Sequence, residues 1–88
     1  MRVIIDPRAE KQLKRLPKTF QVIVGRKIRQ LGNPTEIQVE QLTGYKKVYK
    51  IRVGNYRIVY KSFTDRKVVF LIGHRREVYK LLDRLLRF

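Results

Sequence analysis

The sequence predicts a small α+β domain in the order β-α-α-β-β-β-α, with a mainly antiparallel four-stranded sheet, a helical hairpin and a C-terminal helix. Three observations lead to this fold class. Apolar residues recur at helical spacing in three stretches, and three short runs typical of strands follow residue 46, separated by turn residues. The chain is also short, and 88 residues with 43% hydrophobic content suit a single domain over residues 1–88.

The first third of the chain predicts one strand and two helices. The run "RVIID" is β-branched and short, as in a strand, and Asp6-Pro7 is typical of a helix N-cap followed by the first helical residue. The first helix ends at Pro17 and the second stops at Gly32-Asn33-Pro34, so the two form an antiparallel hairpin. Their apolar stripes are Ala9, Leu13 and Leu16, and Phe20, Ile23, Val24, Ile28 and Leu31.

The rest of the chain predicts three strands and a helix. An irregular connection over residues 35–47 leads to strands at 47–53, 56–63 and 67–72, joined by Gly54-Asn55 and by a turn at 64–66. The run "VVFLI" lacks alternation, which predicts a central strand buried on both faces. The C-terminal helix carries Val78, Leu81, Leu82, Leu85 and Leu86. We expect the helices to cover one face of the sheet and to leave part of the other open.

The Gly54-Asn55 hairpin gathers cations on one face of its two strands. A two-residue turn places Arg52 opposite Arg57, and alternation then puts Lys50 and Lys61 on the same face, away from the apolar one. Like charges directly opposite destabilise a sheet, and no Asp or Glu lies between Gln41 and Thr64. We therefore expect these cations to lack local carboxylate partners and to bind an external anion such as a phosphate. An ordinary solvated basic face is the alternative.

The composition points to an anionic partner. The 22 Lys and Arg against seven Asp and Glu give a formal charge of +15, as in proteins that bind phosphates, but charge alone does not separate nucleic acid, anionic membrane and acidic protein. The absence of Cys excludes disulfides and thiolate metal sites. No signal-peptide core and no apolar run of membrane-spanning length is present, so we expect a cytoplasmic protein without membrane contact.

A second candidate stretch is "GHRREVYK", at the end of the predicted central strand. His74, Arg75 and Arg76 emerge where a strand passes into a helix, which is a favoured place for functional side chains, while Glu77 suits the helix start. The alternative is that His74 is an ordinary solvent-facing residue and that Arg75 and Arg76 are ordinary surface charges. Tyr79 follows the apolar Val78 on the helix, so it is either a half-buried core edge or a functional side chain.

Two of these stretches carry a family resemblance. "LTGYKKVYKIRVGNYRIVYK" followed by "VVFLIGHRREVYK" resembles the RelE/ParE superfamily of toxins from type II toxin-antitoxin modules, with the RelE branch the closer match, over nearly the whole chain. The resemblance implies a ribosome-dependent endoribonuclease that cuts mRNA in the ribosomal A site and is silenced by an acidic antitoxin. It also implies metal-free, cofactor-free chemistry in which the ribose 2′-hydroxyl attacks the adjacent phosphate.

By that resemblance the family's functional positions are Lys50, Arg52, Arg57, one of Arg75 or Arg76, and Tyr79. Some members carry Lys where this chain has Arg52. Lys46, Lys47, Lys61, His74 and Arg76 complete the candidate RNA-binding set, although no firm family role transfers to His74.

General acid-base chemistry suggests a role for each member of this set. Phosphodiester cleavage needs a base, an acid and charge stabilisation on the phosphate oxygens. We expect neighbouring cations to lower the pKa of Lys50 so that it acts as base, with Arg52 and Arg57 holding the developing charge. Arg75 or Tyr79 is the candidate acid, and Tyr79 stacking on a base is an alternative role.

Two other functions fit the same pattern. A ParE-like inhibitor of DNA gyrase shares the scaffold and needs no catalytic set, and an RNA- or ribosome-binding module without chemistry needs only the positive charge. The joint occurrence of Lys50, Arg57 and Tyr79 favours the nuclease.

Overall fold

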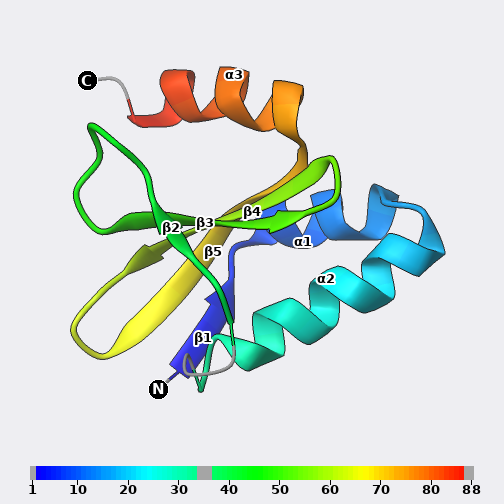
Figure 1. Cartoon of the computed structure of the whole chain (residues 1–88), viewed down its shortest axis with the longest axis horizontal. Helices are drawn as coiled ribbons and strands as arrows, with labels where there is room; N and C mark the ends of the chain where they lie inside the picture. The colour runs from blue at the N-terminus through cyan, green and yellow to red at the C-terminus, as the bar shows by residue number, and fades with distance from the viewer. Residues whose placement is uncertain (1, 34–36, 87–88) are drawn as a thin grey trace.

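The computed structural model describes residues 2–33 and 37–86, and its elements follow the predicted order with one short strand added (Figure 1). Pro34 and the side chain of Leu86, both named above, lie outside the described part. The elements are β1 (Arg2–Ile5), α1 (Pro7–Arg15), α2 (Lys18–Gln30), β2 (Glu40–Gln41), β3 (Val48–Val53), β4 (Tyr56–Ser62), β5 (Arg66–His74) and α3 (Arg75–Leu86).

The sheet has five strands in the order β1-β5-β4-β3-β2. β1 runs parallel to β5, and the other neighbouring pairs are antiparallel, so the sheet is mixed. The fold class is therefore as predicted, with five strands in place of four. The prediction of an irregular connection over 35–47 was wrong at β2, because a strand of two residues is too short to show an alternating pattern.

Local signals at the N-terminus act as the sequence predicts. The Asp6 side chain accepts a hydrogen bond of 2.7 Å from the backbone N–H of Arg8, which caps α1 where Pro7 begins it. The helical hairpin then turns at Leu16 and Pro17, and Gln21 closes the turn by donating from its side-chain amide to the Leu16 carbonyl at 2.7 Å.

The β3–β4 hairpin has the predicted register at every position. Arg52 pairs with Arg57, Lys50 with Val59 and Val53 with Tyr56 across the Gly54-Asn55 turn. Gly54 takes the left-handed conformation, with φ of +57°, which glycine adopts without steric cost. A two-residue connection leaves only this pairing, so the face on which each cation lies was fixed by the turn.

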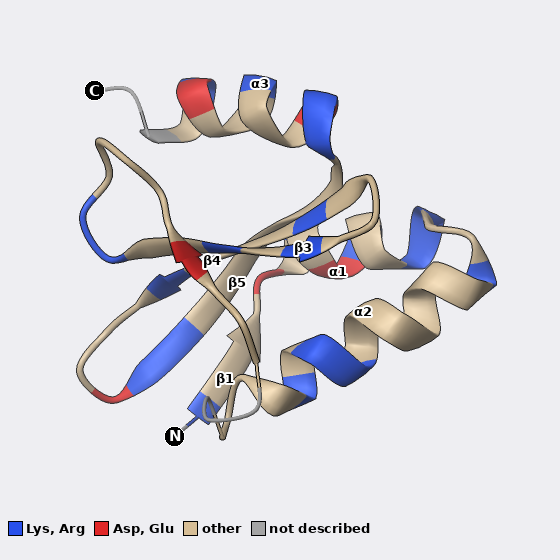
Figure 2. Ribbon diagram, viewed as in Figure 1, with Lys and Arg blue, Asp and Glu red and all other residues tan. Residues whose placement is uncertain are grey.

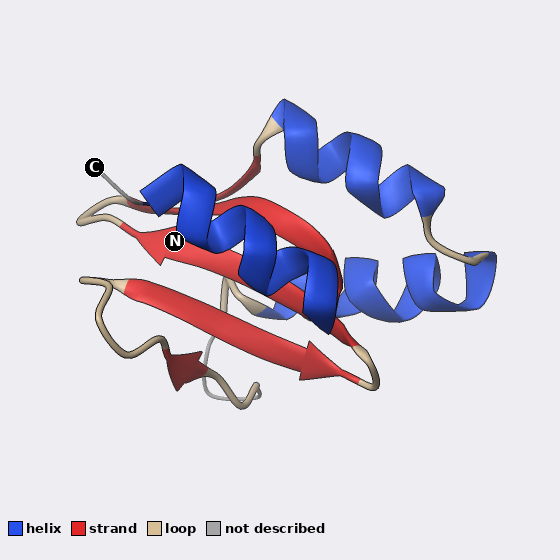
Figure 3. Ribbon diagram, turned by 90° about the horizontal axis from the view of Figure 1, so that it is seen from above, coloured by secondary structure: helices blue, strands red, loops and turns tan. Residues whose placement is uncertain are grey.

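Apolar clusters lie on both faces of the sheet, and the expectation that the helices share one face was wrong (Figure 1). α1 and α2 cover the face that carries Ile51 and Ile58, through a cluster that includes Val24 and Ile28. α3 packs on the opposite face, where Val78 and Leu82 join a second cluster. Figure 3 shows α3 lying across the strands on that side. The second cluster also holds Leu42, Val48, Val59 and Leu71.

The strand β5 supplies both clusters, as its continuous apolar run predicted. The pairing of β4 with β5 shifts between Val59 and Tyr60, so that Val59 faces Leu71 while Tyr60 faces Val69. Val69 therefore belongs to the cluster under α1 and α2, and Leu71 to the cluster under α3. A bulge of this kind places residues two apart on opposite faces.

Among the described residues, no helix combines the length and the apolar character needed to cross a bilayer.

Candidate active site

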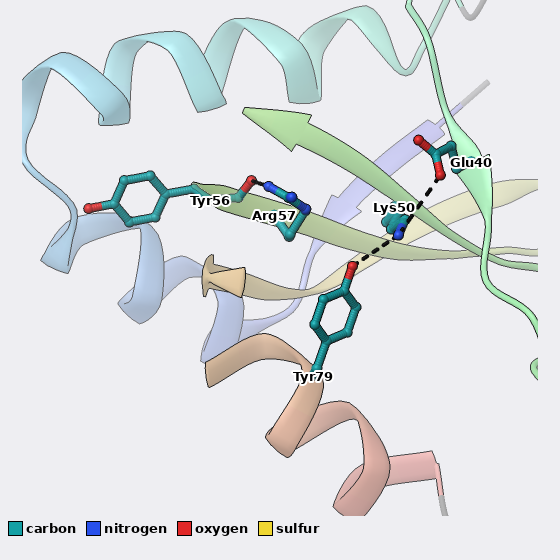
Figure 4. Close-up of polar contacts among 5 residues, drawn as sticks. All are labelled: Glu40, Lys50, Tyr56, Arg57 and Tyr79. Carbon is teal, nitrogen blue, oxygen red and sulfur yellow. Dashed lines mark hydrogen bonds and ion pairs between the residues drawn. The ribbon is translucent and has the colours of Figure 1, made fainter. Parts of the chain in front are cut away.

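The site is centred on a contact between β3 and α3. The Nζ atom of Lys50 donates a hydrogen bond of 2.9 Å to the hydroxyl oxygen of Tyr79, two residues that are 29 positions apart in the chain (Figure 4). The same Nζ lies 3.9 Å from Oε2 of Glu40, which pairs with Lys50 across β2 and β3. Packing of α3 on the cation face thus brings together Lys50 and Tyr79, which the sequence singled out separately.

Glu40 corrects the expectation that the cations have no local carboxylate. It lies one residue before the carboxylate-free interval from Gln41 to Thr64, and the pairing of β2 with β3 places it opposite Lys50. Its side chain is 74% exposed, so water weakens the ion pair, which we expect to contribute less than about 1 kcal/mol. Sequence reasoning missed this residue because nothing in the pattern of residues 35–47 indicated a strand.

Tyr79 is the ionisable group whose environment is most informative for the site. Tyr79 is 40% exposed, and its hydroxyl contacts Lys50. Its side chain therefore points at Lys50 and is not part of the buried core. The hydrogen bond from Lys50 lowers the pKa of Tyr79, partial burial opposes this, and the positive charges of Lys50 and Arg57 lower the pKa further. The phenol is therefore a stronger acid than a free tyrosine side chain.

Arg57 is buried and satisfied by its own hairpin. Arg57 is only 8% exposed. Its Nη1 donates a hydrogen bond of 2.8 Å to the carbonyl oxygen of Tyr56 (Figure 4) and another of 2.8 Å to the carbonyl oxygen of Gly54. The guanidinium has five N–H donors, so these two bonds leave others for a ligand. Arg57 thus fixes the shape of the turn and presents a rigid positive charge near Tyr79.

Arg52 lies across from Arg57 but in different surroundings. It is exposed, and it lines a groove with Lys50 beside the edge of β3. The helix α2 contributes Lys27 to the same groove, a residue that sequence reasoning did not single out. The sequence could not predict that Lys27 lies at this groove, because its position depends on how α2 crosses the sheet.

His74 ends β5, and Arg75 and Arg76 begin α3. His74 pairs with Tyr56, on the face of α1 and α2, and its ring meets the Tyr56 ring edge-on at 6.1 Å. Its Nδ1 accepts a hydrogen bond from the backbone N–H of Arg76 at 3.3 Å, so His74 caps α3. Arg75 and Arg76 are exposed, and the backbone N–H of Arg75 donates to the Asn55 carbonyl at 2.8 Å.

The remaining candidate RNA-binding residues lie at the other end of the hairpin. Lys46 and Lys47 precede β3 in an exposed loop, and Lys61 pairs with Val48 near the end of β4. Lys47 has a φ of +57°, an uncommon conformation for a residue with a side chain. Lys61 places its Nζ 5.5 Å from the centre of the Phe63 ring. Together these residues extend the positive surface away from Lys50 along the strands.

The charge distribution around the site is strongly positive. Figure 2 shows Lys and Arg on every helix and on β1, β3, β4 and β5, with few acidic residues between them. The described residues contain no group of three or more His, Cys, Asp and Glu side chains that could hold a metal ion. A lysine in contact with a tyrosine hydroxyl, beside two arginines, is a set of groups that can transfer protons and stabilise negative charge.

Comparison with known proteins gives consistent matches. The family model described as the ParE toxin of the type II toxin-antitoxin system parDE matches residues 3–79. The curated toxin RelE3 of Methanocaldococcus jannaschii is 34% identical over 47 residues, and the match spans about half (53%) of this chain and 53% of that protein.

Solved structures show the same fold. The RelB-RelE antitoxin-toxin complex from Methanococcus jannaschii superposes with a TM-score of 0.76 at 24% identity, covering 89% of this chain and 96% of that one. The isolated E. coli RelE toxin superposes with a TM-score of 0.68 at 27% identity, covering 97% of this chain and 98% of that one.

Proposed function

Because the chain belongs to the ParE toxin family of type II toxin-antitoxin systems, within the RelE/ParE superfamily, we propose that it is a RelE-like toxin that cleaves messenger RNA in the ribosomal A site. The observation that carries the proposal is the 2.9 Å contact between Lys50 and Tyr79 on a face that also holds Arg52 and Arg57. A fold that only binds a protein has no need for an ammonium and an acidified phenol in contact.

In the proposed reaction the ribose 2′-hydroxyl attacks the adjacent phosphorus without a metal ion. Lys50 takes the 2′-hydroxyl proton as the bond from O2′ to phosphorus forms, and Tyr79 gives its proton to O5′ as the bond from phosphorus to O5′ breaks. The products are a 2′,3′-cyclic phosphate and a free 5′-hydroxyl. Arg57 and Arg52 stabilise the charge that develops on the phosphate oxygens.

The lowered pKa of Tyr79 supports its assignment as the acid over Arg75. A phenol with a pKa below its ordinary value of about 10 donates a proton more readily at neutral pH, whereas a guanidinium has a pKa above about 12. Arg75 is exposed and its backbone is tied to the hairpin turn, which suits a contact with RNA phosphate at the margin of the site.

We propose that the partner that silences this activity is an acidic antitoxin. Five of the similar solved structures are described as complexes of RelE-type toxins with RelB-type antitoxins or an antitoxin peptide. The net charge of +15 suits an acidic segment that lies over the basic face or displaces α3, since either would neutralise charge and break the contact between Lys50 and Tyr79.

The second candidate function is inhibition of DNA gyrase, because the matching family model is that of the ParE toxin. A gyrase inhibitor acts through protein contacts, so its activity should survive the loss of Lys50 or Tyr79 side-chain chemistry. Binding of RNA or ribosomes without chemistry is the third.

Primer extension on translated mRNA, with purified ribosomes, separates these functions. The wild-type protein should cut within the A site, and Lys50→Ala and Tyr79→Phe should each lower the rate by about 10²- to 10⁴-fold, the range for loss of one acid-base group. Lys11→Ala, on the exposed side of α1, should leave the rate unchanged. Supercoiling of plasmid DNA by gyrase is measured in parallel.

Arg57 needs a separate control because its side chain also holds the hairpin turn. Arg57→Ala should abolish cutting, and its thermal midpoint shows whether the fold is intact, while Arg57→Lys keeps a positive charge at the position. Wild-type protein that leaves translated messages uncut and inhibits supercoiling would replace the nuclease with the gyrase inhibitor. Wild-type protein that neither cuts messages nor inhibits supercoiling, and that binds ribosomes, would support the third function, binding without chemistry.

A further inference from the structure

A groove runs from the Lys50 side chain along the outer edge of β3. Its volume is about 790 Å³. Its walls are α2, the chain over residues 37–40 and β3 itself. The lining residues are Lys27, Ile37, Gln38, Val39, Glu40, Lys50, Ile51 and Arg52. Because Lys50 belongs both to this groove and to the contact with Tyr79, the groove borders the candidate active site.

The groove is positively charged, and its cationic side chains outnumber its carboxylates. Lys27, Lys50 and Arg52 stand against the single carboxylate of Glu40, which is engaged with Lys50. Within residues 2–33 and 37–86, neither the Lys27 side chain nor the Arg52 side chain makes a hydrogen bond or an ion pair. Lys27 is half-buried and lines the groove. Cations arranged in this way favour an anionic ligand.

We propose that this groove carries the single-stranded RNA next to the cleaved linkage, and that Lys27 binds a flanking phosphate. The inference rests on the proposed nuclease function and extends it. A polymer whose phosphate is held by Arg52 continues into neighbouring space, and this groove is lined by both Lys50 and Arg52. Lys27 is then an RNA-binding residue from the helical hairpin, outside the sheet and α3.

The test is a salt titration of binding that does not depend on cleavage. The probe is a single-stranded, fully 2′-O-methylated oligoribonucleotide, whose blocked 2′ oxygens prevent the reaction, and affinity is measured by fluorescence anisotropy over a range of NaCl concentrations. Each phosphate contact in single-stranded nucleic acid contributes about 0.7 to the slope of log K against log salt. Lys27→Ala should therefore lower the magnitude of the slope by about 0.7, and Lys27→Arg should keep it.

Two matched variants sharpen the result. Arg26→Ala removes the same charge from the next position of α2, which is exposed and does not line the groove, so the slope should stay at the wild-type value. Glu40→Gln removes the negative charge from the groove and should tighten binding at low salt. Thermal midpoints within a few degrees of wild type show that each variant is folded.

Equal slopes for Lys27→Ala and Arg26→Ala would overturn the proposal, because binding would then follow total charge alone. It would also fall if Lys27→Ala weakened binding of a polyglutamate peptide and left RNA binding unchanged, since the groove would then suit an acidic protein. Cleavage of translated mRNA is scored separately. A reduced slope in a protein that cuts no message supports the groove and contradicts the nuclease, and cutting with an unchanged slope does the reverse.

Discussion

Tyr79 shows how a single residue links the fold to the proposed chemistry. It sits on α3 directly after Val78, which is buried against the sheet, so the helix holds the phenol at the margin of the cluster and aims it at β3. There it accepts the hydrogen bond from Lys50 and lies within the positive field of Arg57. Its acidity is thus a property of how α3 is packed.

The acidity of Tyr79 is directly measurable. We predict that Lys50→Met raises the pKa of Tyr79 toward its ordinary value of about 10, because it removes the hydrogen bond that is the largest cause of the lowered pKa. The readout is the chemical shift of the ring Cζ carbon in tyrosine-labelled protein as a function of pH, with Tyr79→Phe identifying the signal. Tyr60, whose pKa burial and Tyr49 raise to about 12, serves as an internal reference that the variant should not move.

The sign of the effect can also be checked. Since the pKa of Tyr79 is lower in the folded protein than in the unfolded chain, its ionisation favours folding, and this contribution fades as pH falls through the folded-state pKa. If Lys50→Met left the Tyr79 titration where it is in wild type, the contact between Lys50 and Tyr79 would not exist in solution, and the acid-base pair would lose its support.

Local sequence chemistry predicted much of the candidate site, and two individual residues of the site and its groove were not predicted. The two-residue turn fixed Lys50, Arg52 and Arg57 on one face because side-chain alternation leaves no freedom once the turn length is known. Sequence reasoning did not place Glu40 or Lys27 at the site, because neither is near these residues in the chain. Both reach Lys50 or its groove through pairings that only the assembled sheet and helices create.

At the scale of elements, α3 is the part that the sequence placed least well. Its apolar stripe was clear, but a stripe does not say which face of a sheet it covers. The β3–β4 hairpin does indicate which face α3 covers. Val48 and Val59 lie on the cation-bearing face, and both are buried. Apolar residues among cations mark a surface that is half covered, and α3 covers it beside Lys50.

The packing of α3 should therefore control the active site. Leu82 is 3% exposed in the cluster under α3, and Leu82→Ala should cost about 3 to 5 kcal/mol of stability where the cavity cannot collapse. We predict that Leu82→Ala increases the hydrogen exchange rate of α3 amides more than that of β4 amides. Cleavage should fall as well, because Tyr79 moves with α3. Leu82→Met, which conserves volume, should change both far less.

Exchange that rises equally in α3 and β4 would contradict this prediction, since α3 would then open only when the whole molecule unfolds. A local opening would in turn identify α3 as the element that an antitoxin segment can displace at low cost.

For the whole molecule, the decisive quantity is the charge of +15 on a body with principal extents of 34 × 28 × 22 Å. The ion pairs formed within the described residues are Lys14 with Glu10, Lys50 with Glu40 and Arg66 with Asp65, and each has at least one strongly exposed partner. Pairs of this kind contribute little, so most of the positive charge is uncompensated. Self-repulsion then opposes folding, and binding of an acidic partner would relieve it.

This balance predicts that salt stabilises the free protein. At about 0.01 M ionic strength the screening length is about 30 Å, so repulsion acts across the entire body, whereas at about 1 M it is about 3 Å and only adjacent charges interact. We expect the thermal midpoint to rise with NaCl, by about 4 to 8 °C for each kcal/mol of repulsion removed. The midpoint is followed by circular dichroism. A midpoint that fell with added NaCl would mean that the three ion pairs outweigh the net charge, and the basic surface would then be balanced within the protein instead of by RNA or an antitoxin.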